Sequence, residues 1–151
     1  MRVVNRQALV PYTPAQMYAL VNGIARYPEF VPWCPETVVL EESATSLRAT
    51  LTIARAGVRV SLTTKNSMVP DASVQMSLVD GPLAAFDGRW EFVPIVDSHA
   101  AGAVVGCKVT LAISYEFKNA ALGIVFGPLF EVTWNSLVDA FVARAHAVYR
   151  G

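Results

Sequence analysis

The residues LFEVTWNSLVDAFVARAHAVYR, numbered 129–150, carry the clearest helical pattern in the chain. Apolar side chains recur there at steps of four and three, namely Phe130, Trp134, Leu137, Phe141, Ala145 and Val148. On another face Glu131, Asn135 and Asp139 recur at steps of four, which is typical of a face in water. A helix of this length measures roughly 33 Å and crosses a small domain. Because it cannot bury its apolar face against itself, the segment predicts a receiving surface upstream.

That surface is predicted to be a sheet, since seven segments have strand character and the longer ones alternate apolar and polar residues. The segments are 2–10, 37–42, 46–53, 58–63, 74–78, 89–92 and 105–117. One face is apolar and the other polar, as in an antiparallel sheet with one face in water. We therefore expect a single α+β domain over 1–151, with a seven-stranded curved antiparallel sheet against the long C-terminal helix.

Two short helices are expected after the first strand. Thr13-Pro14-Ala15-Gln16 is a strong helix start, with Thr13 as N-cap, Pro14 at the first helical position and Gln16 placed to close a capping box. Residues 24–31 form a further turn or two. Tyr27, Phe30 and Trp33 make an aromatic cluster there, which either fills the core or contacts a ligand.

The composition of the chain is unusually apolar. It is 54% hydrophobic and 16% charged, so either its core is large or an apolar surface encloses something else. The sequence shows no signal peptide and no uninterrupted membrane span. Cys34 and Cys107 are expected to be reduced core thiols. We expect a cytoplasmic protein.

Charge is unevenly distributed although the net charge is zero. The segment 46–69 holds four bases and no acid, namely Arg48, Arg55, Arg59 and Lys65. These residues are either an ordinary solvated strand face or a docking surface for an anionic partner. We expect no DNA partner.

Four spaced motifs resemble a known family: ALVPYTPAQMYALVN (8–22), YPEFVPWC (27–34), LVDGP (78–82) and GRWEF (88–92). They are similar to those of the RatA and coenzyme Q-binding family, in the START-like superfamily of polyketide cyclases and lipid transporters. The resemblance implies a helix-grip fold, in which the sheet grips the C-terminal helix around a hydrophobic cavity. It also implies two roles. One is the binding of ubiquinone or related polyisoprenoids for respiration, and the other is association with the large ribosomal subunit that blocks subunit joining.

The candidate ligand-binding residues are apolar side chains expected on the inner faces of the strands and the helix. They are Phe30, Trp90, Phe92, Tyr115, Phe117, Trp134, Leu137 and Phe141. These side chains either pack on one another or line a cavity between the curved sheet and the straight helix.

Signals for catalysis are sparse. His99 and His146 have no Cys or carboxylate at metal-ligand spacing, so we expect no metal site. The sequence has no glycine-rich phosphate loop and no nucleophile motif. We therefore expect no catalytic residues and no enzyme, and no cofactor other than a bound ubiquinone or related isoprenoid lipid.

The sequence thus favours non-enzymatic binding of a ubiquinone or polyisoprenoid ligand, with transient contact at the inner membrane surface. The first alternative is a ribosome-associated toxin that docks through the four bases, and the second is a cyclase- or dehydratase-like enzyme. Residues 120–130 lack a continuous helical pattern because Gly123, Gly127 and Pro128 interrupt them. We expect this segment to be the gate of the cavity.

Overall fold

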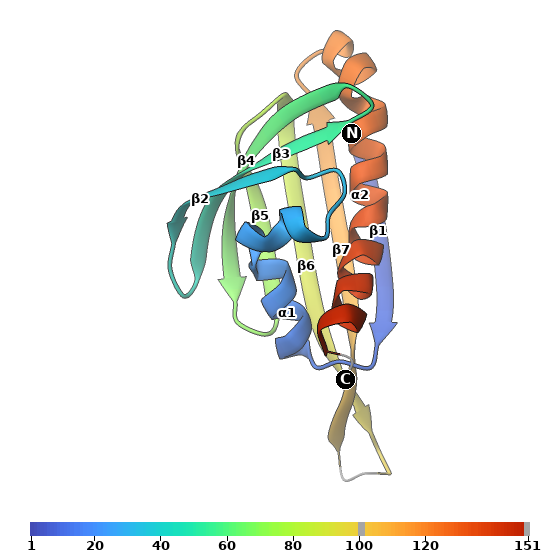
Figure 1. Cartoon of the computed structure of the whole chain (residues 1–151). Coiled ribbons are helices and arrows are strands. Elements are labelled where there is room, and N and C mark those ends of the chain that lie inside the picture. The colour runs from blue at the N-terminus through green and yellow to red at the C-terminus, as the bar shows by residue number, and fades with distance from the viewer. Residues whose placement is uncertain (100–101, 150–151) are drawn as a thin grey trace.

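A computed structural model describes residues 1–99 and 102–149 of the chain. Seven strands form one sheet in the order β1-β7-β6-β5-β4-β3-β2, and every neighbouring pair is antiparallel. Their bounds are β1 Arg2–Val10, β2 Glu36–Glu42, β3 Ser46–Arg55, β4 Val58–Val69, β5 Ser73–Asp80, β6 Leu83–Asp97 and β7 Ala103–Phe117. The sheet curves around one long helix (Figure 1). The predicted α+β class and the seven-stranded antiparallel sheet are confirmed.

The long helix α2 spans Ala120–Tyr149 and lies along the concave face of the sheet (Figure 1). By length and composition α2 is apolar enough to cross a membrane, but the central helix of a folded domain meets the same condition. Here Phe130, Trp134 and Phe141 are buried against the sheet. The predicted apolar face of the helix is therefore its core face.

The predicted start of α2 was wrong. The helix begins at Ala120, so the segment 120–130 is its first turns and has no break at Pro128. Asn119 caps it by accepting a hydrogen bond from the backbone N–H of Leu122 at 2.9 Å. Leu122 and Phe126 extend the partly or fully buried stripe backwards from Phe130 in steps of four. The predicted end at Arg150 lies outside the described residues.

Two short helices follow β1, as predicted. Helix α1 spans Pro14–Asn22, and a 3₁₀ helix, η1, spans Ile24–Glu29. The predicted capping box is present: Thr13 Oγ1 accepts from the backbone N–H of Gln16 at 3.1 Å, and Gln16 Oε1 accepts from that of Thr13 at 2.8 Å. Both helices cover the end of the concave face that α2 leaves open (Figure 1).

Strand β6 is much longer than its predicted segment 89–92. It pairs with β7 from Leu83 to Asp97, and the two strands extend past their neighbours as a long hairpin (Figure 1). Gly106 of β7 allows β1 to approach, because a Cβ at that position would lie 2.4 Å from the carbonyl oxygen of Val10. The first and the last strand of the chain are thus neighbours in the sheet.

Candidate functional site

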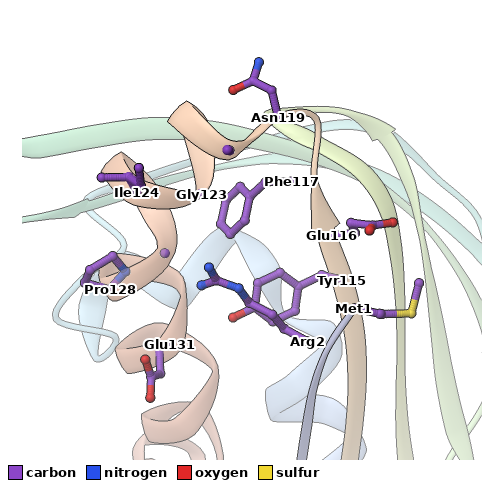
Figure 2. Close-up of a pocket in the computed structure, with 12 residues that line it drawn as sticks. Met1, Arg2, Tyr115, Glu116, Phe117, Asn119, Gly123, Ile124, Pro128 and Glu131 are labelled. Carbon is purple, nitrogen blue, oxygen red and sulfur yellow. The ribbon is translucent and has the colours of Figure 1, made fainter.

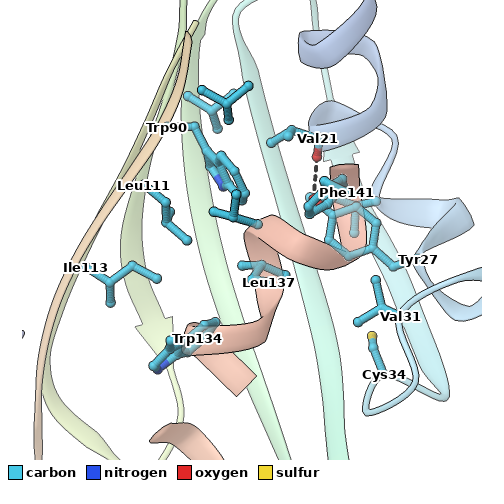
Figure 3. Packing of buried hydrophobic residues seen from close by; sticks show 14 of the residues in the cluster. Val21, Tyr27, Val31, Cys34, Trp90, Leu111, Ile113, Trp134, Leu137 and Phe141 are labelled. Carbon is cyan, nitrogen blue, oxygen red and sulfur yellow. Dashed lines mark hydrogen bonds between the residues drawn. The ribbon is translucent and has the colours of Figure 1, made fainter. Parts of the chain in front are cut away.

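A small enclosed cavity lies between the sheet, α2 and the two short helices. We call it the inner chamber; its volume is about 40 Å³. Figure 3 shows Trp90 of the sheet facing Trp134 and Leu137 of α2 across this region. The chamber is lined by Val21, Ile24, Tyr27, Trp33, Leu51, Leu62, Thr64, Asn66, Val74, Met76, Phe86, Trp90, Trp134 and Leu137.

Two polar residues of the chamber were missed by the sequence analysis. Thr64 and Asn66 of β4 are 4% and 3% exposed, and Thr64 Oγ1 donates to Asn66 Oδ1 at 3.1 Å. The period-two pattern of β4 could have predicted that both side chains point inward. The inward positions do not end at the predicted Leu62 but continue through Thr64, Asn66 and Met68. The prediction stopped where the inward residues became polar.

Among the described residues that line the chamber, Tyr27 alone has a titratable side chain. Its hydroxyl donates to the backbone carbonyl of Val21 (Figure 3), and burial raises the pKa of Tyr27 far above its ordinary value. The hydroxyl therefore stays protonated at neutral pH, and its proton is donated to the Val21 carbonyl.

A larger space lies beside the chamber on the outside of α2. This outer groove has a volume of about 820 Å³ and lies between α2, the loop after η1 and the end of the β3–β4 hairpin. Its walls include Phe30, Arg55 and Arg144. The guanidinium of Arg144 lies 5.0 Å from the centre of the Phe30 ring and forms an ion pair with Glu29 at 2.8 Å.

Trp33 lines both the inner chamber and the outer groove. Its side chain is buried, and its indole Nε1 donates to Ser136 Oγ of α2 at 3.2 Å. Its ring lies edge-on to Trp134, with the ring centres 6.5 Å apart. Trp33 is therefore the partition between the two spaces.

A third space lies at the amino end of α2 and holds about 700 Å³ (Figure 2). We call it the end pocket. The Arg2 side chain crosses it, with its guanidinium 5.0 Å from the centre of the Phe117 ring. A Cβ on Gly127 would lie 2.6 Å from Nη1 of Arg2, and one on Gly123 would lie 3.6 Å from Nη2. Gly127 therefore leaves room for Arg2, whereas a Cβ at Gly123 would make only an ordinary van der Waals contact with it.

The eight candidate ligand-binding residues do not share one site. Trp90, Trp134 and Leu137 line the inner chamber, Phe30 lines the outer groove, and Tyr115 and Phe117 line the end pocket. Phe92 stacks on Trp90 and Phe141 packs edge-on against it, both within the core. Ligand binding by these eight residues remains a prediction. Trp90, Trp134 and Leu137, which line the inner chamber, fit that prediction most directly.

The four candidate docking bases divide between two surfaces. Arg48 and Lys65 lie opposite each other in register, on the face of the sheet that points away from the chamber. Arg59 shares that face and forms an ion pair with Glu36 at 3.3 Å. Arg55 is at the end of β3 and lines the outer groove instead.

Both cysteines and His146 contact other parts of the fold and are not grouped with one another. Cys34 and Cys107 are unpaired and buried, and burial raises the pKa of both thiols to about 11. His146 Nδ1 lies 2.6 Å from the hydroxyl of Tyr12. Within residues 1–99 and 102–149, no three His, Cys, Asp or Glu side chains are grouped to hold a metal ion.

Comparison with known proteins identifies the family of the chain. The sequence profile of a family described as polyketide cyclase/dehydrase and lipid transport matches residues 10–142. The chain belongs to this family. It is 39% identical to the ribosome association toxin RatA of Vibrio cholerae serotype O1, over 99% of both chains.

A more distant relative is the mitochondrial coenzyme Q-binding protein COQ10 homolog B of Xenopus laevis. It is 27% identical, over 96% of this chain and 58% of that protein. The fold is similar to the Zhui aromatase/cyclase of Streptomyces sp. R1128, with a TM-score of 0.79 and 17% identity over 99% and 96% of the two chains. The resemblance inferred from the four motifs is confirmed, and so is the helix-grip fold.

Proposed function

We propose that the protein binds a long apolar ligand of the ubiquinone or polyisoprenoid class, in the inner chamber and the adjoining outer groove, without converting it chemically. The observation that carries this proposal is an enclosed apolar chamber with a buried polar pair at Thr64 and Asn66, in a member of a lipid-transport family. The chamber's described lining contains no Asp, Glu, His or Lys that could transfer a proton, which favours binding over catalysis.

The size of the chamber indicates how the ligand is bound. A buried water needs roughly 10–15 Å³ of such space, so about 40 Å³ holds only a few waters. The outer groove, at about 820 Å³, is within the range of ordinary ligand sites, which is about 300–1,000 Å³. We therefore assign the ligand to both spaces. The Trp33 side chain, which separates them, must move aside when the ligand binds.

The first test is an organic extract of the native protein analysed by mass spectrometry, in which an isoprenoid lipid is expected. The second is the Ser136→Ala variant, which removes the acceptor that holds Trp33. A neutral hydrogen bond stabilises the closed form by about 1 kcal/mol, so ligand affinity should rise about fivefold.

Asn135→Ala is the matched control, since the Asn135 side chain donates to the Glu131 carbonyl of its own helix and is not hydrogen-bonded to Trp33 in the described part of the chain. Equal affinity in both variants and the wild type would remove Trp33 from the ligand path. An extract without lipid, together with no binding of added ubiquinone, would contradict the ligand proposal itself.

Association with the large ribosomal subunit is the second candidate, and it is favoured by the RatA relatives that match nearly the whole chain. Ribosomal RNA presents phosphate charge, and the outer sheet face offers Arg48 and Lys65 side by side. We expect co-sedimentation with large subunits that weakens steeply with added salt.

The variant Arg48→Glu, Lys65→Glu should abolish this co-sedimentation. It should retain ligand binding, because the two bases lie on the face opposite the chamber. Arg26→Glu is a control, as Arg26 is an exposed base on η1. Undiminished sedimentation of the folded double variant would exclude this surface.

Both candidate functions place the protein in the cytoplasm, and ligand exchange adds transient contact with the inner membrane surface. Ile124 and Val125 at the exposed amino end of α2 are 78% and 54% exposed and could supply that contact.

A further inference from the structure

Asn66 is a polar residue in an apolar setting. It lies on the inner face of β4, where its neighbours in register are Leu47 of β3 and Met76 of β5. Its side chain is 3% exposed and lines the inner chamber. The neighbouring strands therefore offer no polar side chain at this level of the sheet.

The hydrogen bonds around Asn66 leave donors available. Thr64 Oγ1 donates to Asn66 Oδ1, which leaves the amide N–H groups of Asn66 for whatever occupies the chamber that this side chain lines. A second lining residue, Trp134, is 4% exposed, and its indole Nε1 has no partner in the described part of the chain. Both groups are N–H donors.

Such donors are costly inside a protein. An N–H buried without an acceptor, such as Trp134 Nε1, loses its hydration and gains nothing in return. Waters in the chamber can pair these donors when no ligand is present. A ligand that displaces the waters must bring an acceptor of its own.

We propose that Asn66 determines specificity by donating a hydrogen bond to a carbonyl oxygen of the ligand, with Trp134 Nε1 as the second donor. The ligand class is an apolar chain that carries a ketone or quinone, rather than a pure hydrocarbon. This inference rests on the proposed ligand-binding function. Thr64 acts as a positioning residue, because its hydroxyl holds the Asn66 side-chain oxygen and turns the nitrogen toward other partners.

The test uses two probes that differ by one group: decanophenone, and decylbenzene, in which a methylene replaces the carbonyl. Their dissociation constants are measured by partition from phosphatidylcholine vesicles, and the ratio of the two is the carbonyl preference. Asn66→Ala removes the donor and enlarges the chamber, so steric exclusion cannot explain a loss. We expect this variant to lower the carbonyl preference about tenfold.

Met68→Leu is the matched control, because Met68 is the next inward residue of β4, is buried and does not line the chamber. An unchanged preference in Asn66→Ala would overturn the inference and leave the ligand-binding function standing. If neither probe binds the wild type, the inference is overturned, and the ligand-binding function is decided separately by the native extract and by added ubiquinone.

A second measurement separates recognition from a structural role. The double variant Thr64→Val, Asn66→Leu replaces the polar pair with apolar groups of similar shape. We expect its melting temperature to equal or exceed that of the wild type, with the carbonyl preference lost. A clearly lower melting temperature with the preference retained would show that the pair serves the fold.

Discussion

At the scale of single residues, the hydroxyl of Thr13 fixes where α1 begins. It accepts from the backbone N–H of Gln16, one of the donors that the first turn of a helix leaves unpaired. The fixed φ of Pro14 then suits the first helical position. All of these effects act within four consecutive residues, so the sequence alone could predict them.

Thr13→Ala should lower the free energy of unfolding by about 1 kcal/mol, because the N–H of Gln16 loses its acceptor. Denaturant unfolding measures the change. Thr13→Ser keeps the hydroxyl and serves as the control. A variant as stable as the wild type would mean that water satisfies the donor equally well.

Asn66 shows where such prediction fails. The alternation of β4 places Asn66 on the inner face, but its polar side chain resembles a strand end, and only the positions of β3, β5 and α2 show that it lines a chamber. The same applies to Trp33, whose role as a partition depends on Ser136 in the last helix. These roles depend on residues distant in sequence, which local patterns do not record.

At the scale of elements, the first turns of α2 show how a helix can contain two glycines and a proline. Gly127 faces Arg2 of β1, which occupies the space that a side chain at position 127 would fill. Pro128 is exposed. Gly127 thus serves a contact with β1, and the segment that was predicted to be irregular forms the first turns of α2.

Gly127→Ala should change the free energy of unfolding only slightly. Alanine favours the helix by about 1 kcal/mol, whereas displacing Arg2 from Phe117 loses about 0.5–1 kcal/mol of cation–π attraction. In an Arg2→Ala background the same substitution should stabilise the protein by nearly the full helical gain. Denaturant unfolding of the four members of this double-mutant cycle gives the coupling.

The coupling free energy between positions 2 and 127 shows whether the Arg2 side chain packs against Gly127. A value of roughly 0.5–1 kcal/mol would support steric packing of Arg2 against Gly127. Additive effects would mean that the guanidinium lies elsewhere in solution.

At the scale of the whole molecule, the architecture followed from patterns that span each element. Period-two alternation and the apolar stripe of α2 predicted a curved sheet against a helix, because burial of one face is a property of an entire segment. The same patterns could not divide the inward aromatic residues among the chamber, the groove and the end pocket. That division depends on where along the sheet each residue lies relative to α2.

The pairing of β1 with β7 has a consequence for synthesis. The first strand to leave the ribosome has no partner until residues 107–115 have been made, and the 30 residues of α2 follow later still. Until then the nascent chain exposes the apolar concave face and a free strand edge, two features that promote aggregation. Pairing of β1 with β7 also slows folding, since the 96 residues between Val10 and Cys107 must form a closed loop first. Until α2 is made, the apolar face and the free strand edge are surfaces that a chaperone can cover.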